Sequence, residues 1–244
     1  MNASIVLPTY NEANNLAAMV EALLSLPHDL RIVVVDDASP DGTGDIAEGL
    51  VAEGYPVSVL HRPRKLGLGS AYGAGFREAL RTQPEAVVQM DADFSHDPRY
   101  VEVLLREIRD CDLVIGSRYL HGVSVVNWPI RRLILSYAAN VYARAVTGVP
   151  LSDLSGGFKC FRGEALGRLD LDSISSQGYA FQIEMNVRAW DAGFKIKEVP
   201  IIFVERRADS SKMSRKVALE AAWKVWLFRW HRTRRPSNVV RKRG

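Results

Sequence analysis

Short apolar runs alternate with amphipathic stretches through the first half of the chain. The runs predict strands at residues 5–7, 32–35, 57–60, 87–90 and 113–115. The stretches between them predict helices at residues 11–26, from about 41, at 69–80 and at 98–109. Asp41 and Thr43 are candidate caps of the second of these helices. Strands that alternate with helices of this length indicate an α/β fold with a mostly parallel, doubly wound sheet.

The alternation changes after Gly116. From there the pattern predicts a longer helix at residues 128–146, a strand at 158–161, a helix at 180–192, an extended segment at 196–203 and a helix at 214–230. The last helix carries Lys216, Glu220 and Lys224 on one stripe, and tryptophans on the rest of its surface. It has no uncharged stretch near the roughly 20 residues of a membrane span, so we expect it to lie in a membrane interface or to pack on the body.

The net charge of +4 is unevenly distributed. Residues 206–244 contain 13 Lys/Arg and 2 Asp/Glu, a charge of +11, which leaves −7 on residues 1–205. An acidic body with a basic end favours an anionic partner surface, such as phospholipid, nucleic acid or acidic protein. The alternative is a solvated, solubilising tail.

Length and cysteine content suggest one large intracellular domain with an appendage. The 244 residues are expected to form a globular domain over residues 1–212, an amphipathic helix over 213–231 and a flexible basic tail over 232–244. Cys111 and Cys160 provide neither a disulfide framework nor metal-ligand spacing. The N-terminus leads into a predicted strand without a signal peptide, so we expect a reducing, cytoplasmic environment.

Carboxylates follow three of the predicted strands. Asp91 and Asp93 come at the end of one strand, and strand alternation places both on the same side. Adjacent carboxylates repel unless a cation lies between them, and Mg²⁺ or Mn²⁺ would keep coordination positions for phosphate oxygens. Glu12 and the pair Asp36 and Asp37 follow two further strands. Because parallel strands end at one crevice, we expect all five side chains to face a single site.

Basic residues in the second half are candidate phosphate ligands. They follow strand ends or flank loops, and they are Arg118, Arg131, Arg132 with Ser136 one turn later, Arg206, Arg207 and Lys212. Residues 65–70 (KLGLGS) open a predicted helix but complete neither a dinucleotide-binding nor a P-loop motif. Gly73 and Gly75 in that helix are expected to allow close helix–sheet packing.

Several segments together carry a family resemblance. Residues 8–12 (PTYNE), 35–43 (VDDASPDGT), 67–69 (GLG) and 91–98 (DADFSHDP) resemble the inverting family-2 glycosyltransferases. Residues 116–119 (GSRY), 179–185 (YAFQIEM) and the stretch from 206 to 213 are similar to the polyprenyl-phosphate (dolichyl-phosphate) mannosyltransferases of that family. The resemblance extends over about residues 4–214.

The resemblance implies a GT-A fold, transfer of mannose from GDP-mannose to a polyprenyl phosphate, and inversion. It implies a donor site formed by Pro8, Tyr10, Glu12, Val35, Asp37, Asp91, Ala92, Asp93, Gln182, Arg206 and Lys212. It implies that Asp91 and Asp93 bind Mg²⁺ or Mn²⁺, and that the acceptor phosphate is bound by Arg118, Arg132 and Ser136. It implies catalytic roles for Asp93, Arg118 and Arg206, and sugar contacts for Gln182 and Glu184.

Two positions depart from the family pattern. Asp209 stands where a glycine is common, and Ser95 stands where some members offer glutamine as a third metal contact. Ser95 is the weaker ligand, so water is expected to fill that coordination position.

An acceptor of this kind lies in a membrane. We therefore expect a protein peripheral on the cytoplasmic membrane face, held by its own helices or by a separate membrane-anchoring protein. No nucleic-acid partner is expected. The alternatives are a related glycosyltransferase that uses UDP-glucose or another nucleotide sugar, a nucleotidyltransferase, and a non-enzymatic adaptor that acts through the basic tail.

Overall fold

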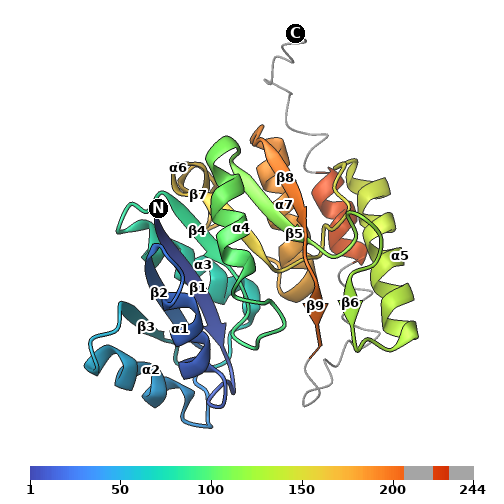
Figure 1. The fold of residues 1–244 in the computed structure, drawn as a ribbon. Coiled ribbons are helices and arrows are strands. Elements are labelled where there is room, and N and C mark those ends of the chain that lie inside the picture. Colours follow the sequence, from blue (N-terminus) through green and yellow to red (C-terminus); the bar gives the residue numbers. More distant parts are fainter. Residues whose placement is uncertain (206–221, 231–244) are drawn as a thin grey trace.

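A seven-stranded sheet forms the centre of the molecule (Figure 1). The computed structural model describes residues 1–205 and 222–230. The strands lie in the order β3-β2-β1-β4-β7-β5-β8. Their bounds are β1 Asn2–Thr9, β2 Asp29–Asp36, β3 Val57–His61, β4 Ala86–Gln89, β5 Leu113–Ser117, β7 Lys159–Arg162 and β8 Ile196–Pro200. Only β7 runs antiparallel to its two neighbours in this sheet, so the predicted mostly parallel sheet is confirmed.

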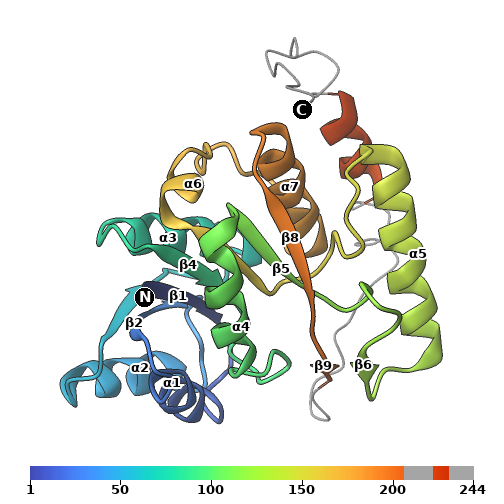
Figure 2. The same ribbon diagram turned by 45° about the horizontal axis from the view of Figure 1, so that its top comes forward.

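Helices cover both faces of the sheet (Figure 2). Their bounds are α1 Leu16–Leu24, α2 Thr43–Ala52, α3 Leu68–Leu80, α4 Tyr100–Glu107, the short 3₁₀ turn η1 Ile108–Asp110, α5 Ile130–Thr147, α6 Gly163–Gly167 and α7 Gly178–Asp191. Residues 222–230 are also helical. Among the described residues, no helix combines the length and the apolar character needed to cross a bilayer.

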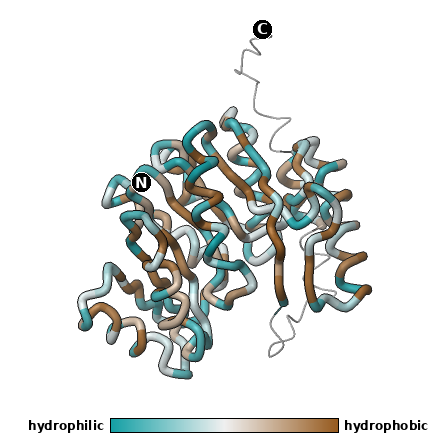
Figure 3. Tube along the Cα trace, viewed as in Figure 1, coloured by the Kyte–Doolittle hydropathy of each residue, from teal (hydrophilic) through white to brown (hydrophobic). Residues whose placement is uncertain are grey.

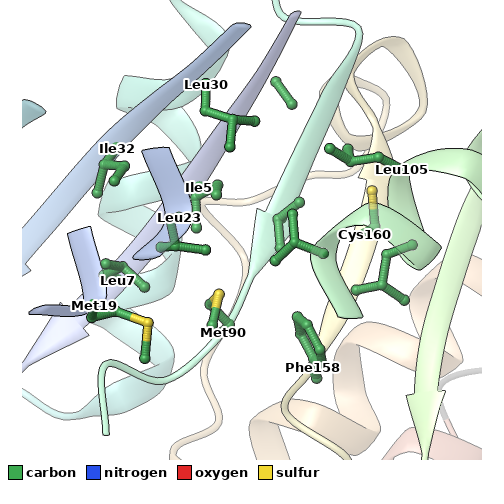
Figure 4. Close-up of a cluster of buried hydrophobic side chains, with 14 of the residues drawn as sticks. Ile5, Leu7, Met19, Leu23, Leu30, Ile32, Met90, Leu105, Phe158 and Cys160 are labelled. Atoms are coloured by element: carbon green, nitrogen blue, oxygen red, sulfur yellow. The ribbon is translucent and has the colours of Figure 1, made fainter. Parts of the chain in front are cut away.

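Two buried apolar clusters lie on opposite sides of the sheet, because successive strand residues point to opposite faces. Ile5 and Leu7 belong to one cluster with residues of α1, α2 and α4. The close-up of this first cluster labels Met19 and Leu23 of α1 and Leu105 of α4 (Figure 4). Val6 packs on the other face with α3, α5, α6 and α7. The apolar character of the inner strands is visible along the chain trace (Figure 3). Burial on both faces explains why these strands are continuous apolar runs in the sequence.

A second, two-stranded sheet lies at one end of the central sheet. Its strands are β6 Val125–Val126 and β9 Phe203–Val204, which pair in parallel. An isolated bridge between His96 and Phe203 connects β9 to the loop after β4. The predicted extended segment 196–203 reaches the first residue of β9 but does not separate it from β8, and β6 was not predicted, because two residues are too few to show a periodic pattern.

The predicted elements are present, with shifts at their ends. The first helix begins at Leu16 rather than at 11, because Asn11 has a left-handed backbone (φ 64°) that no helix accommodates. Asp41 accepts a hydrogen bond from the backbone N–H of Thr43 (3.1 Å), which is the first residue of α2. The predicted helix at 214–230 is described only over 222–230, and the rest of it lies outside the described residues.

The prediction of close glycine packing in α3 is confirmed at one position and wrong at the other. A Cβ added to Gly75 would lie 2.3 Å from Cγ1 of Val6 in β1, so this contact requires glycine. A Cβ added to Gly73 would come no closer than 3.9 Å to another group, which is an ordinary contact distance. Residues two apart on a helix point in different directions, so Gly73 does not share the contact that Gly75 makes with β1.

Candidate active site

The carboxyl ends of β2, β1 and β4 lie side by side at one edge of the sheet (Figure 1). This order brings the residues after each strand together, as the sequence predicted for Glu12, the Asp36 pair and the Asp91 pair. The ends are tied to one another, since Oγ1 of Thr9 donates to Oδ1 of buried Asp36 (3.0 Å). Asp36 is thus a structural link between β1 and β2.

Each of these three strands is followed by a non-glycine residue in the left-handed region. These are Asn11 (φ 64°), Ala38 (φ 56°) and Phe94 (φ 58°). This conformation is uncommon for residues with a Cβ and tends to occur where a fold holds a functional loop in place. Here it turns the chain sharply at three adjacent strand ends, and the space that these three loops border is called the crevice below.

The predicted nucleoside side of the crevice is built around Asp37. Its buried carboxylate pairs with Nη1 of Arg62 (2.6 Å) and accepts the backbone N–H groups of Leu66 (3.3 Å) and Gly67 (3.1 Å). Burial lowers the pKa of Arg62, and the charge of Asp37 opposes that shift. Asp37 therefore anchors the loop before α3, a role that the sequence did not indicate because Arg62 lies 25 positions away.

The other predicted nucleoside residues lie around this anchor. The ring of Tyr10 is exposed, and Nζ of Lys65 lies 3.6 Å from its centroid. Oε2 of Glu12 accepts a hydrogen bond from Asn15 (2.8 Å). Pro8 pairs in register with Val35, whose side chain is fully buried in the core. A donor contact at Val35 would therefore involve its main chain.

The pair Asp91 and Asp93 lies in the loop after β4, with buried Ala92 between them. Oδ1 of Asp91 accepts the hydroxyl of Tyr72 (3.0 Å), and its backbone N–H donates to Nδ1 of His96 (3.3 Å). The side chain of Asp91 is 38% exposed, so it remains accessible from the crevice. Burial and then the charge of Asp93 raise the pKa of Asp91, although His96, Tyr72 and Lys159 act in the opposite direction.

A divalent cation bound by Asp91 and Asp93 would have to take most of its ligands from elsewhere. In residues 1–205 and 222–230, no three His, Cys, Asp or Glu side chains form a group that could hold a metal ion. Asp91 and Asp93 would therefore supply two ligands, and phosphate oxygens and water the others, as is usual for Mg²⁺ at phosphate sites. Ser95 is buried and its hydroxyl donates to Oδ1 of Asp93 (2.5 Å), so it fixes the orientation of the Asp93 carboxylate.

A group of buried polar side chains lies close to Asp91. Lys159, at the start of β7, is fully buried, and its Nζ donates to the carbonyl oxygen of Gly156 (2.8 Å) and to Oε1 of Gln182. Nε2 of Gln89 donates to the same Oε1 (2.7 Å). Burial lowers the pKa of Lys159 to about 7. The sequence did not identify Lys159 or Gln89, since each reads as one polar residue in an apolar strand.

The predicted acceptor side is centred on Arg118, which follows β5 directly. Its Nε and Nη2 each lie 2.7 Å from an oxygen of the fully buried Asp153, and Nη2 also donates to Ser155 (2.9 Å). Burial alone would lower the pKa of Arg118, but the charge of Asp153 raises it above its ordinary value. Among the described residues, none accepts a hydrogen bond from Nη1.

Aromatic rings connect Arg118 with the two other predicted acceptor residues. Its guanidinium carbon lies 5.4 Å from the ring centroid of Tyr119, and the hydroxyl of Tyr119 donates to Oγ of Ser136 (2.8 Å). The guanidinium carbons of Arg118 and Arg132 lie 5.6 Å and 4.2 Å from the ring centroid of Trp128. The structure therefore brings Arg118, Arg132 and Ser136 together around the rings of Tyr119 and Trp128.

The guanidinium of Arg132 is paired with Glu205, the last described residue before the gap. The side chains of this pair are 21% and 15% exposed, respectively. The predicted donor-loop residues Arg206 and Lys212, and the divergent Asp209, lie outside the described residues.

Glu184 does not face the crevice as expected for a sugar ligand. Its oxygens accept hydrogen bonds from Arg188 and from the backbone N–H of Ser176 (3.1 Å). The side chain is buried, so Glu184 holds the segment before α7 in place. Helical periodicity explains the difference, because residues two apart on a helix point in different directions.

Comparison with solved structures identifies the fold. A mannosyltransferase from Pyrobaculum calidifontis in complex with GDP-Man and Mn²⁺ superposes with a TM-score of 0.63 at 18% identity, covering 96% of this chain and 65% of that one. Glucosyl-3-phosphoglycerate synthase from Mycobacterium tuberculosis, in complex with Mn²⁺, UDP and glucosyl-3-phosphoglycerate, superposes with a TM-score of 0.65 at 20% identity, covering 97% and 81%. These similarities establish a GT-A glycosyltransferase fold and nothing finer.

The sequence comparisons identify the family. Residues 4–170 match the model of glycosyl transferase family 2, and the chain belongs to that family. It is 45% identical to an undecaprenyl-phosphate mannosyltransferase from Micrococcus luteus over 94% of both chains. It is also 45% identical to a polyprenol monophosphomannose synthase from Mycolicibacterium smegmatis, over 97% of this chain and 91% of that one.

Proposed function

We propose that this family-2 glycosyltransferase transfers mannose from GDP-mannose to a polyprenyl phosphate. The observation that carries the proposal is the cluster of Arg118, Arg132 and Ser136 beside the strand-end carboxylates. Two guanidinium groups close to one tryptophan ring suit a phosphate acceptor better than a sugar hydroxyl. The names of the two relatives at 45% identity support the same acceptor and sugar.

The carboxylate pair defines the donor side of the proposed reaction. Asp91 and Asp93 would hold Mg²⁺ or Mn²⁺, which offsets the negative charge of the departing diphosphate when it is bound. Tyr72 and Ser95 hold the two carboxylates in position through hydrogen bonds of 3.0 Å and 2.5 Å. We propose that the nucleoside lies over Tyr10 and the loop anchored by Asp37.

The acceptor side needs charge stabilisation rather than a base. A phosphate monoester is already ionised at neutral pH, so its oxygen can attack C1 of mannose without losing a proton to the protein. Nη1 of Arg118 and the guanidinium of Arg132 would offset the charge that repels the acceptor from the diphosphate. Asp153 keeps Arg118 oriented through the two hydrogen bonds of 2.7 Å.

The bond changes follow from this placement. The bond from the acceptor oxygen to C1 forms as the bond from C1 to the diphosphate oxygen breaks, and GDP leaves. Attack from the face opposite the leaving group inverts the anomeric centre, so an α-linked donor gives a polyprenyl β-mannosyl phosphate. Arg206 and Lys212, which lie outside the described residues, are proposed to contact the donor.

The acceptor requires contact with a membrane, and two adjacent helices offer an apolar surface for it. On α5 the side chains of Ile130, Ile134, Tyr137 and Val141 are 66%, 62%, 51% and 40% exposed, and their spacing places them on one stripe. The helix at 222–230 packs beside α5, since the hydroxyl of Tyr142 in α5 donates to the carbonyl oxygen of Ala222 (3.1 Å).

The second helix carries an apolar stripe of its own. Trp223, Trp226 and Trp230 are 66%, 53% and 56% exposed and share one helical face. Exposed apolar area of this extent marks an interaction surface, and tryptophans suit the membrane interface. We propose that the protein is peripheral on the cytoplasmic face of a membrane, with or without a separate anchoring protein.

Transfer of radiolabelled sugar into organic-extractable lipid tests the proposal. The purified chain is incubated with polyprenyl phosphate, Mg²⁺ or Mn²⁺, and either GDP-mannose or UDP-glucose. Label from GDP-mannose alone, lost on addition of EDTA, is the expected result. Label from UDP-glucose alone would replace the donor, and label that persists in EDTA would remove the metal from the mechanism.

A further inference from the structure

Lys159 is a fully buried cation that the mechanism above does not use. It lies at the start of β7, between the donor and acceptor sides of the crevice. Its Nζ donates two hydrogen bonds, one to the carbonyl oxygen of Gly156 (2.8 Å) and one to Oε1 of Gln182. Burying a lysine is costly unless its contacts serve the structure or the site, so its position needs a specific explanation.

The contacts of Lys159 fix the orientation of the Gln182 side chain. Oε1 of Gln182 accepts from Lys159 and also from Nε2 of Gln89 (2.7 Å). Nε2 of Gln89 in turn donates to the carbonyl oxygen of Gly157 (2.8 Å), which fixes the orientation of Gln89. A flipped Gln182 amide would place its NH₂ group against two N–H donors, so only one orientation is compatible with these neighbours.

In that orientation Nε2 of Gln182 faces the side of the crevice where Asp91 lies. A Cβ added to Gly157 would lie 3.5 Å from this Nε2, 3.5 Å from Cε1 of His96 and 3.7 Å from Oδ2 of Asp91. The space that a side chain at 157 would fill is therefore bordered by the amide nitrogen of Gln182 and the carboxylate of Asp91. In the part of the chain that the structure describes, no group accepts a hydrogen bond from this Nε2.

We propose that Lys159 is a positioning residue for the donor sugar. With Gln89, it holds Oε1 of Gln182 so that Nε2 donates to a hydroxyl oxygen of the sugar beside Asp91. Lys159 itself touches no substrate. This inference rests on the proposed function through the donor-site role of Gln182.

A different explanation assigns Lys159 only to the charge balance of the buried carboxylates Asp91 and Asp153, both of which act on its pKa. The two explanations differ in one respect. If Lys159 acts through Gln182, its removal has little effect once the Gln182 amide is gone. If it acts on the carboxylates, the two effects are independent.

A double-mutant cycle separates these explanations. The variants are Lys159→Met, Gln182→Leu and the pair, with the exposed Lys195→Met as the matched control. We expect each single variant to lower kcat by roughly tenfold or more, as loss of one oriented donor does. We expect Lys159→Met to change kcat less than twofold when Gln182→Leu is already present. Multiplicative effects would overturn the proposal.

A binding measurement gives a readout that does not depend on turnover. Both single variants should weaken binding of the nucleotide sugar, and leave binding of the free nucleoside diphosphate equal to that of Lys195→Met. GDP-mannose and GDP are compared, and UDP-glucose and UDP are run in parallel, so an error in the proposed donor is separable from an error about Lys159. An equal loss of affinity for sugar nucleotide and diphosphate would contradict a sugar-facing role.

Gln89→Leu is a second test that remains usable if the Lys159→Met protein does not fold. It removes the other donor to Oε1 of Gln182 without changing any charge. The proposal expects the same pattern: a lower kcat that disappears in the Gln182→Leu background. An unchanged kcat in a folded Gln89→Leu protein would show that the amide orientation does not matter.

Discussion

At the scale of single residues, the chemistry depends on how charged side chains are held in position. Asp93 is the clearest case, because its Oδ1 is fixed by both the hydroxyl and the backbone N–H of Ser95 (2.5 Å and 3.0 Å). Asp93→Asn should abolish metal-dependent nucleotide binding and lower transfer by more than the roughly 10–100-fold that loss of an outer-shell partner costs. Titration of Mn²⁺ in the presence of GDP, followed by calorimetry, measures this.

Asp97→Asn is the matched control for that experiment. Asp97 lies in the same loop but pairs with the exposed Arg99 (2.6 Å), away from the crevice. It should bind metal and nucleotide as the unaltered protein does. A folded Asp93→Asn protein with near-normal turnover would remove this carboxylate from the metal site.

The pairing of Arg132 with Glu205 leads to a second prediction. The carboxylate of Glu205 pairs with the same guanidinium that we propose for the acceptor phosphate, so the carboxylate and the phosphate would compete for Arg132. Arg132→Ala should raise the KM for polyprenyl phosphate at least about tenfold and leave the KM for the donor nearly unchanged. Glu205→Gln should lower the acceptor KM about two- to fivefold.

Initial rates with a short-chain polyprenyl phosphate in detergent give both constants. The neighbouring Arg131→Ala is the control, since Arg131 is exposed on α5. A rise of the acceptor KM in Glu205→Gln would mean that the glutamate positions Arg132 for the phosphate rather than competing with it.

The buried Lys159 makes stability depend on pH in a defined direction. Burial lowers its pKa from 10.5 to about 7, so between these values the unfolded chain binds a proton that the folded chain does not. Stability therefore rises with pH across this window and is constant below about pH 7, where both states are protonated. Between pH 7 and 9 the unfolding free energy should rise by about 2 kcal/mol more than in Lys159→Met.

Urea denaturation at the two pH values measures the difference. The comparison with Lys159→Met cancels the titration of all other groups. An equal pH dependence in both proteins would mean that Lys159 keeps its proton in the folded state.

The residues that could be predicted from the sequence are those at strand ends. Asp91, Asp93 and Arg118 directly follow apolar runs, so their place at the edge of the sheet follows from the strand pattern. Lys159 and Arg62 could not be found in this way, because their roles depend on contacts with Gln182 and Asp37, which are 23 and 25 positions away. Only the folded chain brings these groups together.

At the scale of elements, the close contact of α3 with β1 determines how the loop before α3 is placed. Gly75→Ala would bring a Cβ to 2.3 Å from Cγ1 of Val6 and 3.0 Å from Cγ2 of Val35. Since both valines are in the strands, relief requires movement of the helix or of the sheet. The expected cost is about 1–3 kcal/mol of unfolding free energy, measured by urea denaturation.

Gly49→Ala provides the opposite expectation in a comparable helix. Gly49 lies inside α2, and an added Cβ would meet nothing within 4 Å. Alanine favours the helix over glycine by roughly 0.5–1 kcal/mol, so this variant should be more stable than the unaltered protein. Equal effects of the two substitutions would mean that helix propensity, not packing, decides both.

Elements were predictable where their pattern was long and not where it was short. The helices from α1 to α5 were found because several turns repeat an apolar spacing. The direction of β7 was not, because a four-residue segment (KCFR) gives no sign of whether the strand runs parallel or antiparallel, and β6 and β9 are shorter still. The sequence also could not tell whether the apolar residues of α5 face the core or the outside.

At the scale of the whole molecule, two of the residues proposed to bind the acceptor and the exposed apolar stripe lie on the same helix. Arg132 and Ser136 occupy one side of α5, and Ile130, Ile134, Tyr137 and Val141 are exposed on another. A lipid whose phosphate reaches Arg132 would therefore have its hydrocarbon close to that stripe. Proximity of this kind would let the protein take its acceptor at the bilayer surface, without lifting the whole chain into water.

Ile134→Glu tests this arrangement. A carboxylate in the middle of the stripe, where the native side chain is 62% exposed, should not disturb the core but should oppose insertion into an anionic surface. We expect weaker binding to phosphatidylglycerol vesicles and at least a severalfold loss of transfer to long-chain acceptor in those vesicles. Transfer to a short-chain acceptor in detergent should stay unchanged, because the phosphate site is intact.

Val51→Glu is the control, since Val51 is also an exposed apolar residue (39%) but lies on α2, far along the sheet from α5 (Figure 1). It should behave as the unaltered protein does in both assays. Equal losses with both acceptors would place Ile134 in the phosphate site rather than on the membrane. Unchanged vesicle binding would mean that either the tryptophan stripe or a separate anchoring protein recruits the chain to the membrane. Trp226→Glu would distinguish these two explanations, since the native side chain of Trp226 is 53% exposed on the neighbouring helix.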